Sequence, residues 1–326
     1  MQHLVLTQFG SPDTAVELAE SSQPSPGADQ VRVRLEAAAI NPSDLMLIQG
    51  KYLVRPKLPA TVGAEGVGIV EDAGHEVDRS IVGKRVILLP TYEYGTWSQH
   101  AVVAERDVVA VPDADPQQLA MLTINPATAH LLLEQAGLTV GDWVGQTAAN
   151  SAVGRLVVAL ARRRGLKTLN VVRREDAAAD IRDAGGDVAL VSGPDLAADI
   201  TRALDGDELG LVISPLGGDL AAPLLDALKF RGKAVMYGSL TGAPSGPSAA
   251  NLFAREIRFT GFCLGNWFFR APRREVVDTL SYLARLVSDG ELSVPVEATY
   301  HLDDYQKAFA HAQTTQRGGK VLFTFD

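Results

Sequence analysis

Short apolar strands and helical patterns alternate from about residue 125 onward, and this alternation constrains the fold more than any other feature. Six strands are expected, at Trp143–Ala148, Thr168–Val172, Val188–Val191, Leu211–Ser214, Ala234–Tyr237 and Ile257–Phe262. Helical patterns lie between several of them, at Arg155–Arg164, Ala177–Ala184, Leu196–Leu204 and Asp219–Lys229. Strands joined by crossover helices predict a doubly wound parallel sheet of six strands in an α/β fold.

The first 120 residues instead carry short strand signals, many of which end at glycine or proline. Residues 31–40, 66–74, 85–90 and 97–112 contain such runs, and the first ten residues are also expected to form a strand. Short strands with frequent turns predict a compact β barrel or a sandwich-like domain.

The last sixty residues return to a β-containing pattern. A helix is expected to begin at Pro272 and to stop at Gly290, with Val276, Leu280 and Leu283 on its apolar face. A strand, a second helix and a final strand in "GGKVLFTFD" are expected after it. We therefore predict a β-rich domain at 1–124, an α/β domain at 125–263, and a return of 264–326 to the first domain.

Composition excludes several classes of protein. Apolar stretches such as Leu156–Ala161 are too short to span a membrane, and the first residues carry no signal-like or transit-like pattern. The single cysteine, Cys263, excludes an intramolecular disulfide framework and a multi-cysteine metal site, which favours a cytoplasmic location. The formal charge of −9 argues against nucleic acid or an acidic membrane as the main partner.

The turn after the first parallel strand is a candidate dinucleotide site. The fingerprint G-x-G-x-x-G fails, because Ala149, Ser151 and Gly154 occupy its three positions. Small side chains still let backbone amides approach a pyrophosphate, and a helix that begins near Ala152 offers a favourable dipole. A turn that binds nothing is the alternative.

Two arginines follow the second parallel strand, where NAD-binding proteins place an acidic residue for the ribose hydroxyl. Arg173 and Arg174 occupy this place in "LNVVRRED". Arginine pairs well with a phosphate, so the pattern favours NADPH over NADH. Two solvated arginines at the start of a helix are the alternative.

With these features in place, seven segments together resemble the medium-chain dehydrogenase/reductase superfamily over essentially the full chain: "INPSDLMLIQGKY", "LPATVGAEGVG", "GTWSQHAV", "LTINPATA", "NSAVG", "LNVVRRED" and "GFCLGNW". The chain is most similar to the zinc-independent 2-enoyl thioester reductases, with quinone oxidoreductases as near relatives. The resemblance implies a GroES-like catalytic domain, a Rossmann domain, and a cofactor in the cleft between them.

The residues that hold zinc in other members of the superfamily are missing. Asn41 stands where those members place a cysteine, and Ala64–Glu65 stands where they place a His-Glu pair. His75–Glu76 is followed by Arg79 in place of a second histidine, so it is not a zinc motif. Catalytic zinc needs three protein ligands, and we expect no metal site.

The resemblance makes Tyr52 the candidate catalytic acid or oxyanion donor for reduction of an α,β-unsaturated acyl thioester. A tyrosine that merely forms a wall of the substrate pocket is the alternative. Quinone reductases often share this tyrosine, so NADPH-dependent reduction of a quinone or of another activated alkene is a second hypothesis. A nucleotide-binding protein without turnover is a third.

Further site residues are implied by the resemblance. The expected cofactor contacts are Asn125, Asn150, Ser151, Ala152, Val153, Tyr237, Gly238, Ser239, Leu240, Phe262, Cys263, Leu264, Gly265 and Lys320. The expected substrate pocket is formed by Trp267, Phe268 and Trp97, with core packing as the alternative.

Three open points accompany these site residues. Asn125 could cap a helix, alone or together with a cofactor contact, and Lys320 could be a surface lysine that opens an edge strand. Arg55 and Lys57 follow Tyr52 closely and indicate an acidic or phosphorylated substrate. The strand in "REIRFTGF" is expected at a sheet edge, which favours a homodimer.

Overall fold

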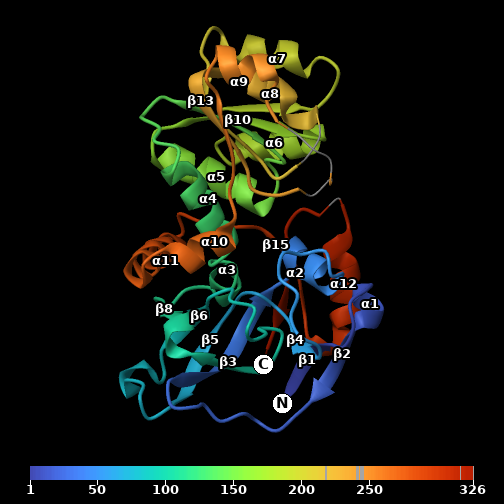
Figure 1. The fold of residues 1–326 in the computed structure, drawn as a ribbon, viewed down its shortest axis with the longest axis vertical. Coiled ribbons are helices and arrows are strands. Elements are labelled where there is room, and N and C mark those ends of the chain that lie inside the picture. Colours follow the sequence, from blue (N-terminus) through green and yellow to red (C-terminus); the bar gives the residue numbers. More distant parts are fainter. Residues whose placement is uncertain (217–218, 240–241, 243–245, 316, 326) are drawn as a thin grey trace. The chain divides into compact units, whose positions relative to one another are not determined.

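The computed structural model of the chain describes residues 1–216, 219–239, 242, 246–315 and 317–325 (Figure 1). The chain forms two compact units. Unit 1 comprises residues 1–127 and 268–326, and unit 2 comprises residues 128–267. The domain boundaries at 124 and 263 that we derived from the sequence stay a prediction.

Unit 1 contains a seven-stranded sheet that is antiparallel apart from one pair. Its strand order is β15 (Val296–Tyr300), β16 (Lys320–Thr324), β3 (Gln30–Ala39), β5 (Gly66–Ala73), β6 (Arg85–Leu88) and β8 (Val108–Ala110), with β7 (His100–Ala104) also paired to β3. Side chains of β3 alternate between buried and partly exposed over most of its length, as its sequence pattern predicted. Strand β16 therefore lies inside the sheet of the first residues, although unit 2 separates the two in the sequence.

A smaller sheet of unit 1 is formed by β2 (Val16–Glu20), β1 (Gln2–Leu6) and β4 (Ala60–Thr61). The core beside it contains Trp97, Phe309 and Phe323, which are fully buried. Helix α12 (Tyr305–Gln313) contributes Phe309 and packs against β16 and α2 (Figure 1).

Helices and short 3-10 turns complete unit 1: α1 (Pro12–Ala15), α2 (Pro42–Ile48), η1 (Arg79–Ile81), η2 (Glu105–Asp107), α3 (Pro116–Leu119), α11 (Arg273–Ser288) and η4 (Leu302–Asp304). The α11 prediction is confirmed, since Val276, Leu280 and Leu283 are buried. Gly290 adopts a φ of 73°, which ends the helix without strain. Helices α4 (Asn125–Glu134) and α10 (Leu264–Arg270) run across the limits between the units.

Unit 2 contains the predicted six-stranded parallel sheet, and the fold-class prediction is confirmed. Its strand order is β11 (Val188–Val191), β10 (Lys167–Val172), β9 (Trp143–Thr147), β12 (Leu209–Ser214), β13 (Leu228–Met236) and β14 (Arg258–Gly261). Its helices and 3-10 turn are α5 (Ala152–Arg163), α6 (Glu175–Asp183), α7 (Leu196–Leu204), η3 (Asp219–Ala221), α8 (Ala222–Asp226) and α9 (Ala249–Ala254). From β9 the chain first adds β10 and β11 on one side of the sheet and then adds β12, β13 and β14 on the other side. Ligands of such sheets bind at the carboxyl ends of the strands beside the point between β9 and β12.

One predicted helix of unit 2 is shorter than expected. We expected a helix over Asp219–Lys229, but Leu228 already pairs with Leu209 of β12 as part of strand β13. Sheet pairing therefore overrides the helical pattern of these residues. Among the described residues, no helix is long and apolar enough to cross a membrane.

Candidate active site

A cluster of buried polar side chains lies in the interior of unit 1. We define the polar cluster as Asn41, Asp44, Glu65, Thr123, Asn125 and Lys320, each at most 7% exposed. These residues come from the beginning of α2, the segment before β5, the beginning of α4 and the first position of β16. Buried charges are tolerated only when they are paired or hydrogen-bonded, so the bonds inside this cluster decide whether it is stable.

Glu65 accepts three hydrogen bonds within the polar cluster. The side-chain amide of Asn41 donates to one carboxylate oxygen at 2.9 Å. The hydroxyl of Thr123 and the backbone amide of Ile124 donate to the other oxygen, each at 2.9 Å. The carboxylate thus fixes the segment that leads into α4.

Lys320 donates hydrogen bonds to Asn41 and to Ile40, the residue before it. Its ammonium group donates to the Asn41 side-chain oxygen at 2.6 Å and to the Ile40 carbonyl at 3.2 Å. The side-chain amide of Asn125 donates to the same Asn41 oxygen at 3.2 Å. The structure therefore corrects one alternative, because Lys320 is buried on an inner strand and is not a surface lysine at a sheet edge. Asn125 is the first residue of α4.

Burial moves the pKa values of the charged members toward neutrality. It raises the pKa of Glu65 to about 7, partly offset by Lys320 and by the donors on Asn41 and Thr123. Burial also raises the pKa of Asp44 to about 6, although the Asn41 backbone amide donates to its carboxylate at 2.8 Å. The pKa of Lys320 falls to about 8 for the same reason, against the attraction of the two carboxylates.

Tyr52 lies in the loop after α2 and forms a pair with Tyr92. The Tyr92 hydroxyl donates to the Tyr52 hydroxyl at 3.3 Å. The two rings pack with their centroids 5.6 Å apart and an interplanar angle of 52°. Tyr52 is partly buried and also packs against the core beside the small sheet.

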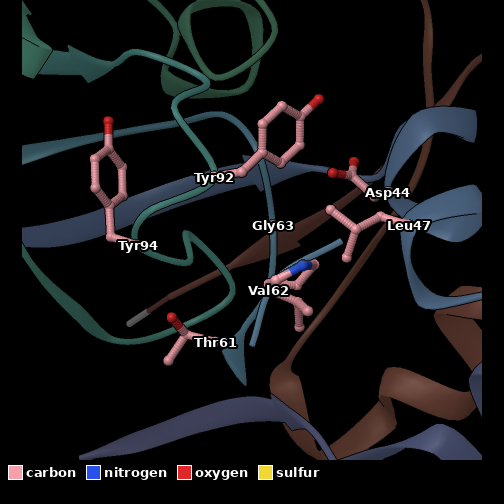
Figure 2. Close-up of a pocket in the computed structure, with 8 residues that line it drawn as sticks. Asp44, Leu47, Thr61, Val62, Gly63, Tyr92 and Tyr94 are labelled. Atoms are coloured by element: carbon pink, nitrogen blue, oxygen red, sulfur yellow. The ribbon is translucent and has the colours of Figure 1, made fainter. Parts of the chain in front are cut away.

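Tyr92 and Asp44 line the same small pocket of unit 1 (Figure 2). The cavity has a volume of about 10 Å³, which is roughly the space of one water molecule. Tyr94 also lines it, but its hydroxyl donates to the Leu89 and Asp107 carbonyls. The pocket connects the tyrosine pair to the polar cluster through Asp44.

In unit 2, the turn between β9 and α5 has the form that the sequence predicted. The Ser151 hydroxyl accepts a hydrogen bond from the Gly154 amide at 3.1 Å and caps α5. A Cβ atom on Gly154 would meet the Ala149 carbonyl oxygen at 2.4 Å, so the helix and the strand approach too closely for any other residue. Asn150, Ser151, Ala152 and Val153 are only partly buried. Backbone amides at the start of a helix suit an anion.

The ends of neighbouring strands of unit 2 lie close to this turn. Thr147 at the end of β9 and Ser214 at the end of β12 share a hydrogen bond of 2.6 Å. The Tyr237 hydroxyl, just after β13, is buried near Ser151 and has no hydrogen bond of good geometry among the described residues. An unsatisfied buried hydroxyl beside a capped helix start fits a bound polar group, so these residues suit a dinucleotide.

The two arginines after β10 differ in their surroundings. Arg173 is exposed, whereas Arg174 caps α6 and forms an ion pair with Asp176 at 3.0 Å. This pair is itself solvent-exposed, so a phosphate could compete for the guanidinium group at little cost.

The remaining predicted site residues that the structure describes lie after β13, after β14 and on α10. Gly238 and Ser239 follow Tyr237, while Leu240 lies outside the described residues. Phe262 and Cys263 join β14 to α10, which begins with Leu264 and Gly265. Trp267 and Phe268 are partly buried on α10.

Trp97 is a core residue and not the pocket wall that we considered. Its side chain is fully buried, and its indole NH donates to the Ala39 carbonyl at 3.1 Å. The ring packs against Phe309 and Phe323, with centroids 5.1 and 5.5 Å away. A side chain enclosed in this way cannot contact a substrate.

Sequence reasoning missed Tyr92 and the hydrogen-bonding role of Glu65. Tyr92 has a φ of 62°, which is rare for a bulky residue, but no sequence pattern marks it. Glu65 could have been found, because an acidic residue inside the apolar segment "LPATVGAEGVG" requires buried partners.

Family models match both parts of the chain. The model described as "Alcohol dehydrogenase GroES-like domain" matches residues 27–113, and the one described as "Zinc-binding dehydrogenase" matches residues 152–282. The residues of this chain do not fit zinc. Among the described residues, no group of three or more histidine, cysteine, aspartate or glutamate side chains could hold a metal ion.

Similar proteins cover the whole chain. The mitochondrial enoyl-[acyl-carrier-protein] reductase of Xenopus tropicalis is 32% identical over 95% of this chain and 91% of its own length. A candidate NADPH:quinone reductase of Bacillus thuringiensis has a TM-score of 0.92 at 28% identity, with 100% of this chain and 99% of that chain covered. A quinone oxidoreductase of Pseudomonas syringae has a TM-score of 0.88 at 27% identity, with 99% of each chain covered.

Proposed function

Because the chain belongs to the medium-chain dehydrogenase/reductase family of oxidoreductases, we propose that it reduces the C=C bond of a 2-enoyl thioester with NADPH. The thioester would be carried by coenzyme A or by a carrier protein. The observation that carries the proposal is the half-buried phenol of Tyr52, whose hydroxyl is held by a second phenol. Enoyl reduction requires such a donor, because negative charge develops on the carbonyl oxygen of the substrate.

The chemistry needs a hydride at the β-carbon, stabilisation of the enolate and a proton at the α-carbon. The nicotinamide cofactor supplies the hydride when it is bound. Tyr52 donates a hydrogen bond to the enolate oxygen or gives its proton to the α-carbon. The hydrogen bond that Tyr52 accepts from Tyr92 favours either role, because it stabilises negative charge on the Tyr52 oxygen.

We assign binding of the cofactor phosphates to the turn between β9 and α5 and to the arginines after β10. The amides of Ala152 and Val153 at the start of α5 suit the pyrophosphate, and Tyr237 offers its unsatisfied hydroxyl near them. Arg173 and Arg174 suit the 2′-phosphate, which is the basis for proposing NADPH. The other cofactor contacts, including Asn125 and Lys320, stay predictions.

Exposed cations beside Tyr52 support a phosphorylated substrate. Lys51, Arg55 and Lys57 are exposed, and none of them forms an ion pair within the part of the chain that the structure describes. The Arg55 guanidinium lies 4.8 Å from the centre of the Phe9 ring. In a chain of charge −9, an uncompensated basic loop suits the phosphates of coenzyme A or of a carrier-protein arm.

Reduction of a quinone is the second candidate function, since two solved structures of similar fold bear that name. The two functions are separated by the oxidation of NADPH with crotonyl-CoA, crotonyl-pantetheine and 1,4-benzoquinone. We expect the highest kcat/KM with crotonyl-CoA and a higher KM with the phosphate-free thioester. Turnover of benzoquinone alone would overturn the proposal.

Tyr52→Phe tests the donor in the same assay. Loss of general acid catalysis should lower kcat roughly hundredfold. The dissociation constant for NADPH should stay unchanged, because the phenol is assigned to the substrate. An unchanged kcat would leave Tyr52 only as a wall of the pocket.

Replacement of both Arg173 and Arg174 by alanine tests the cofactor assignment. Loss of two charge-assisted contacts should raise the KM for NADPH roughly tenfold to hundredfold and leave the KM for NADH nearly unchanged. Arg202→Ala, which removes an exposed arginine of α7, is the matched control and should change neither value. Equal effects on both cofactors would remove the 2′-phosphate assignment.

A homodimer and a cytoplasmic location complete the proposal. Strand β14 lies at the edge of its sheet with all four residues exposed, which supports pairing with a second copy. Sedimentation at micromolar concentration tests the dimer, and a monomer would exclude it.

A further inference from the structure

We propose that Tyr92 is a positioning residue for Tyr52, which donates a hydrogen bond to the Tyr52 hydroxyl and stabilises the phenolate that Tyr52 becomes when it gives up its proton. This inference rests on the proposed function, because the donor role of Tyr52 belongs to it. It adds a residue that the sequence did not indicate.

The geometry of the pair supports this role. The hydroxyl oxygens are 3.3 Å apart, and Tyr92 is the donor. The rings pack at 5.6 Å, so contact between the rings holds the two hydroxyl groups together. A hydrogen bond donated to a phenol becomes stronger when the phenol ionises, because the acceptor then carries a full charge.

The backbone of Tyr92 has a conformation that is unfavourable for a bulky residue. Its φ of 62° lies in the left-handed region, which disfavours bulky side chains and is found at functional sites. Two residues later, the Tyr94 hydroxyl bonds to the carbonyls of Leu89 and Asp107 and anchors the segment.

The surroundings keep Tyr92 protonated and therefore a donor. Burial raises the pKa of Tyr92, and the nearby Asp44 carboxylate and Tyr52 raise it further, while the Ser43 hydroxyl acts in the opposite direction. Asp44 on α2 is the charged group that acts on Tyr92, and Asp44 in turn feels the charge of Lys320. A donor that does not ionise can support Tyr52 over the whole working pH range.

In the proposed step, Tyr52 transfers its proton to the substrate enolate. The O–H bond of Tyr52 breaks, a C–H bond forms at the α-carbon of the substrate enolate, and the electron pair remains on the Tyr52 oxygen. Tyr92 keeps its own proton throughout and only strengthens its hydrogen bond. Water then returns a proton to Tyr52.

The test compares Tyr92→Phe with the matched control Tyr305→Phe in the full-length protein, because the Tyr305 hydroxyl donates to the Val16 carbonyl and not to the Tyr92 segment. Fluorinated tyrosine is incorporated, and the ionisation of Tyr52 is followed by 19F NMR without cofactor or substrate, with the Tyr52 signal assigned by its loss in Tyr52→Phe. Tyr92→Phe should raise the pKa of Tyr52 by about one unit, since a hydrogen bond to a charged group is lost. Tyr305→Phe should leave it unchanged.

Activity gives the second readout. In crotonyl-CoA reduction, Tyr92→Phe should lower kcat about tenfold, in proportion to the lost stabilisation, and shift the alkaline limb of the pH profile upward. The dissociation constant for NADPH should not change. If Tyr92→Phe does not fold, Tyr92→Met removes the hydroxyl while an adaptable apolar side chain fills much of the space of the ring, and a pKa shift in the same direction is expected.

An unchanged pKa of Tyr52 in the folded variant would overturn the inference. Because this pKa is measured without substrate, the result is separate from the proposed function. Absence of crotonyl-CoA turnover in the wild type would overturn the function, whereas the titration alone decides whether Tyr92 tunes Tyr52.

Discussion

The two units bury polar side chains in opposite ways. Unit 1 encloses two carboxyl groups and an ammonium group, Asp44, Glu65 and Lys320, together with uncharged amides and hydroxyls. Within the described part of unit 2, the buried polar side chains are all uncharged: Thr128, Gln146, Thr147, Thr168, Asn170 and Ser214. Both interiors contain hydrogen-bonded networks, but among the described residues only that of unit 1 contains fully buried carboxyl and ammonium groups.

The two units therefore differ in the kind of hydrogen-bonded network that they bury. In unit 2, Gln146 donates to Asn170 at 2.7 Å, and Asn170 donates to Thr168 and to the Val188 carbonyl. These bonds between uncharged side chains tie β9, β10 and β11 together, and Thr168 also donates to the Asp187 carboxylate. In unit 1, the Asp44 carboxyl group lies near Tyr92, where its charge acts on the tyrosine pair.

The largest expected effect is the loss of the buried cation. Lys320→Met should lower the free energy of unfolding of unit 1 by about 4 kcal/mol, because it leaves buried carboxyl groups without a counter-charge. Native-state hydrogen exchange of amides in β3 and β16 measures this value. Lys307→Met is the matched control, because Lys307 forms an exposed ion pair with Asp304 and its loss should cost less than about 1 kcal/mol. Equal effects of the two changes would contradict a charged core.

The second effect is a pH dependence that the buried carboxyl group of Glu65 gives to unit 1. The pKa of Glu65 is raised from 4.5 to about 7 in the folded state, so the native state binds more protons in this interval. The contribution of Glu65 is therefore fully present below pH 4.5 and should fall by about 3 kcal/mol as the pH rises to about 7.

Glu65→Gln keeps the shape of the side chain and removes its titration. The difference in unfolding free energy between wild type and Glu65→Gln should shrink across that pH interval. A difference that stays flat would mean that Glu65 is ionised throughout. The three hydrogen bonds that it accepts would then outweigh its burial.

The smallest effect concerns the neutral network of unit 2. Asn170→Ala should destabilise unit 2 by about 2 kcal/mol, because partners of a buried amide are left unsatisfied. The cost should be the same at pH 5 and at pH 8, as followed by hydrogen exchange in β9 and β10. A cost that varies with pH would break the contrast between the two units.

Local sequence signals predicted much of the fold. The strands of unit 2 are recognisable as apolar runs, and α11 is bounded by Pro272 and Gly290, which act through their own backbone preferences. The pattern failed where pairing partners decide the outcome, as at Leu228, which joins β13 because β12 lies beside it.

The candidate site was less predictable because its contacts are distant in sequence. Lys320 and Asn41 are 279 positions apart, and Tyr92 and Tyr52 are 40 positions apart. No periodicity encodes such pairs. Resemblance singled out Tyr52, whereas its partner emerged only from the packing of the loops around it.

The position of β16 has a consequence for the newly made chain on the ribosome. Unit 2 is continuous from residue 128 to residue 267, so it leaves the ribosome complete before β16 exists. The large sheet of unit 1 then still lacks β15 and β16, so β3 has an open edge, and Asn41 lacks the Lys320 ammonium group. Unit 1 therefore stays incomplete during the synthesis of about 200 residues, with an open sheet edge and with carboxyl groups that lack their counter-charge. Chaperones would be needed most at this stage.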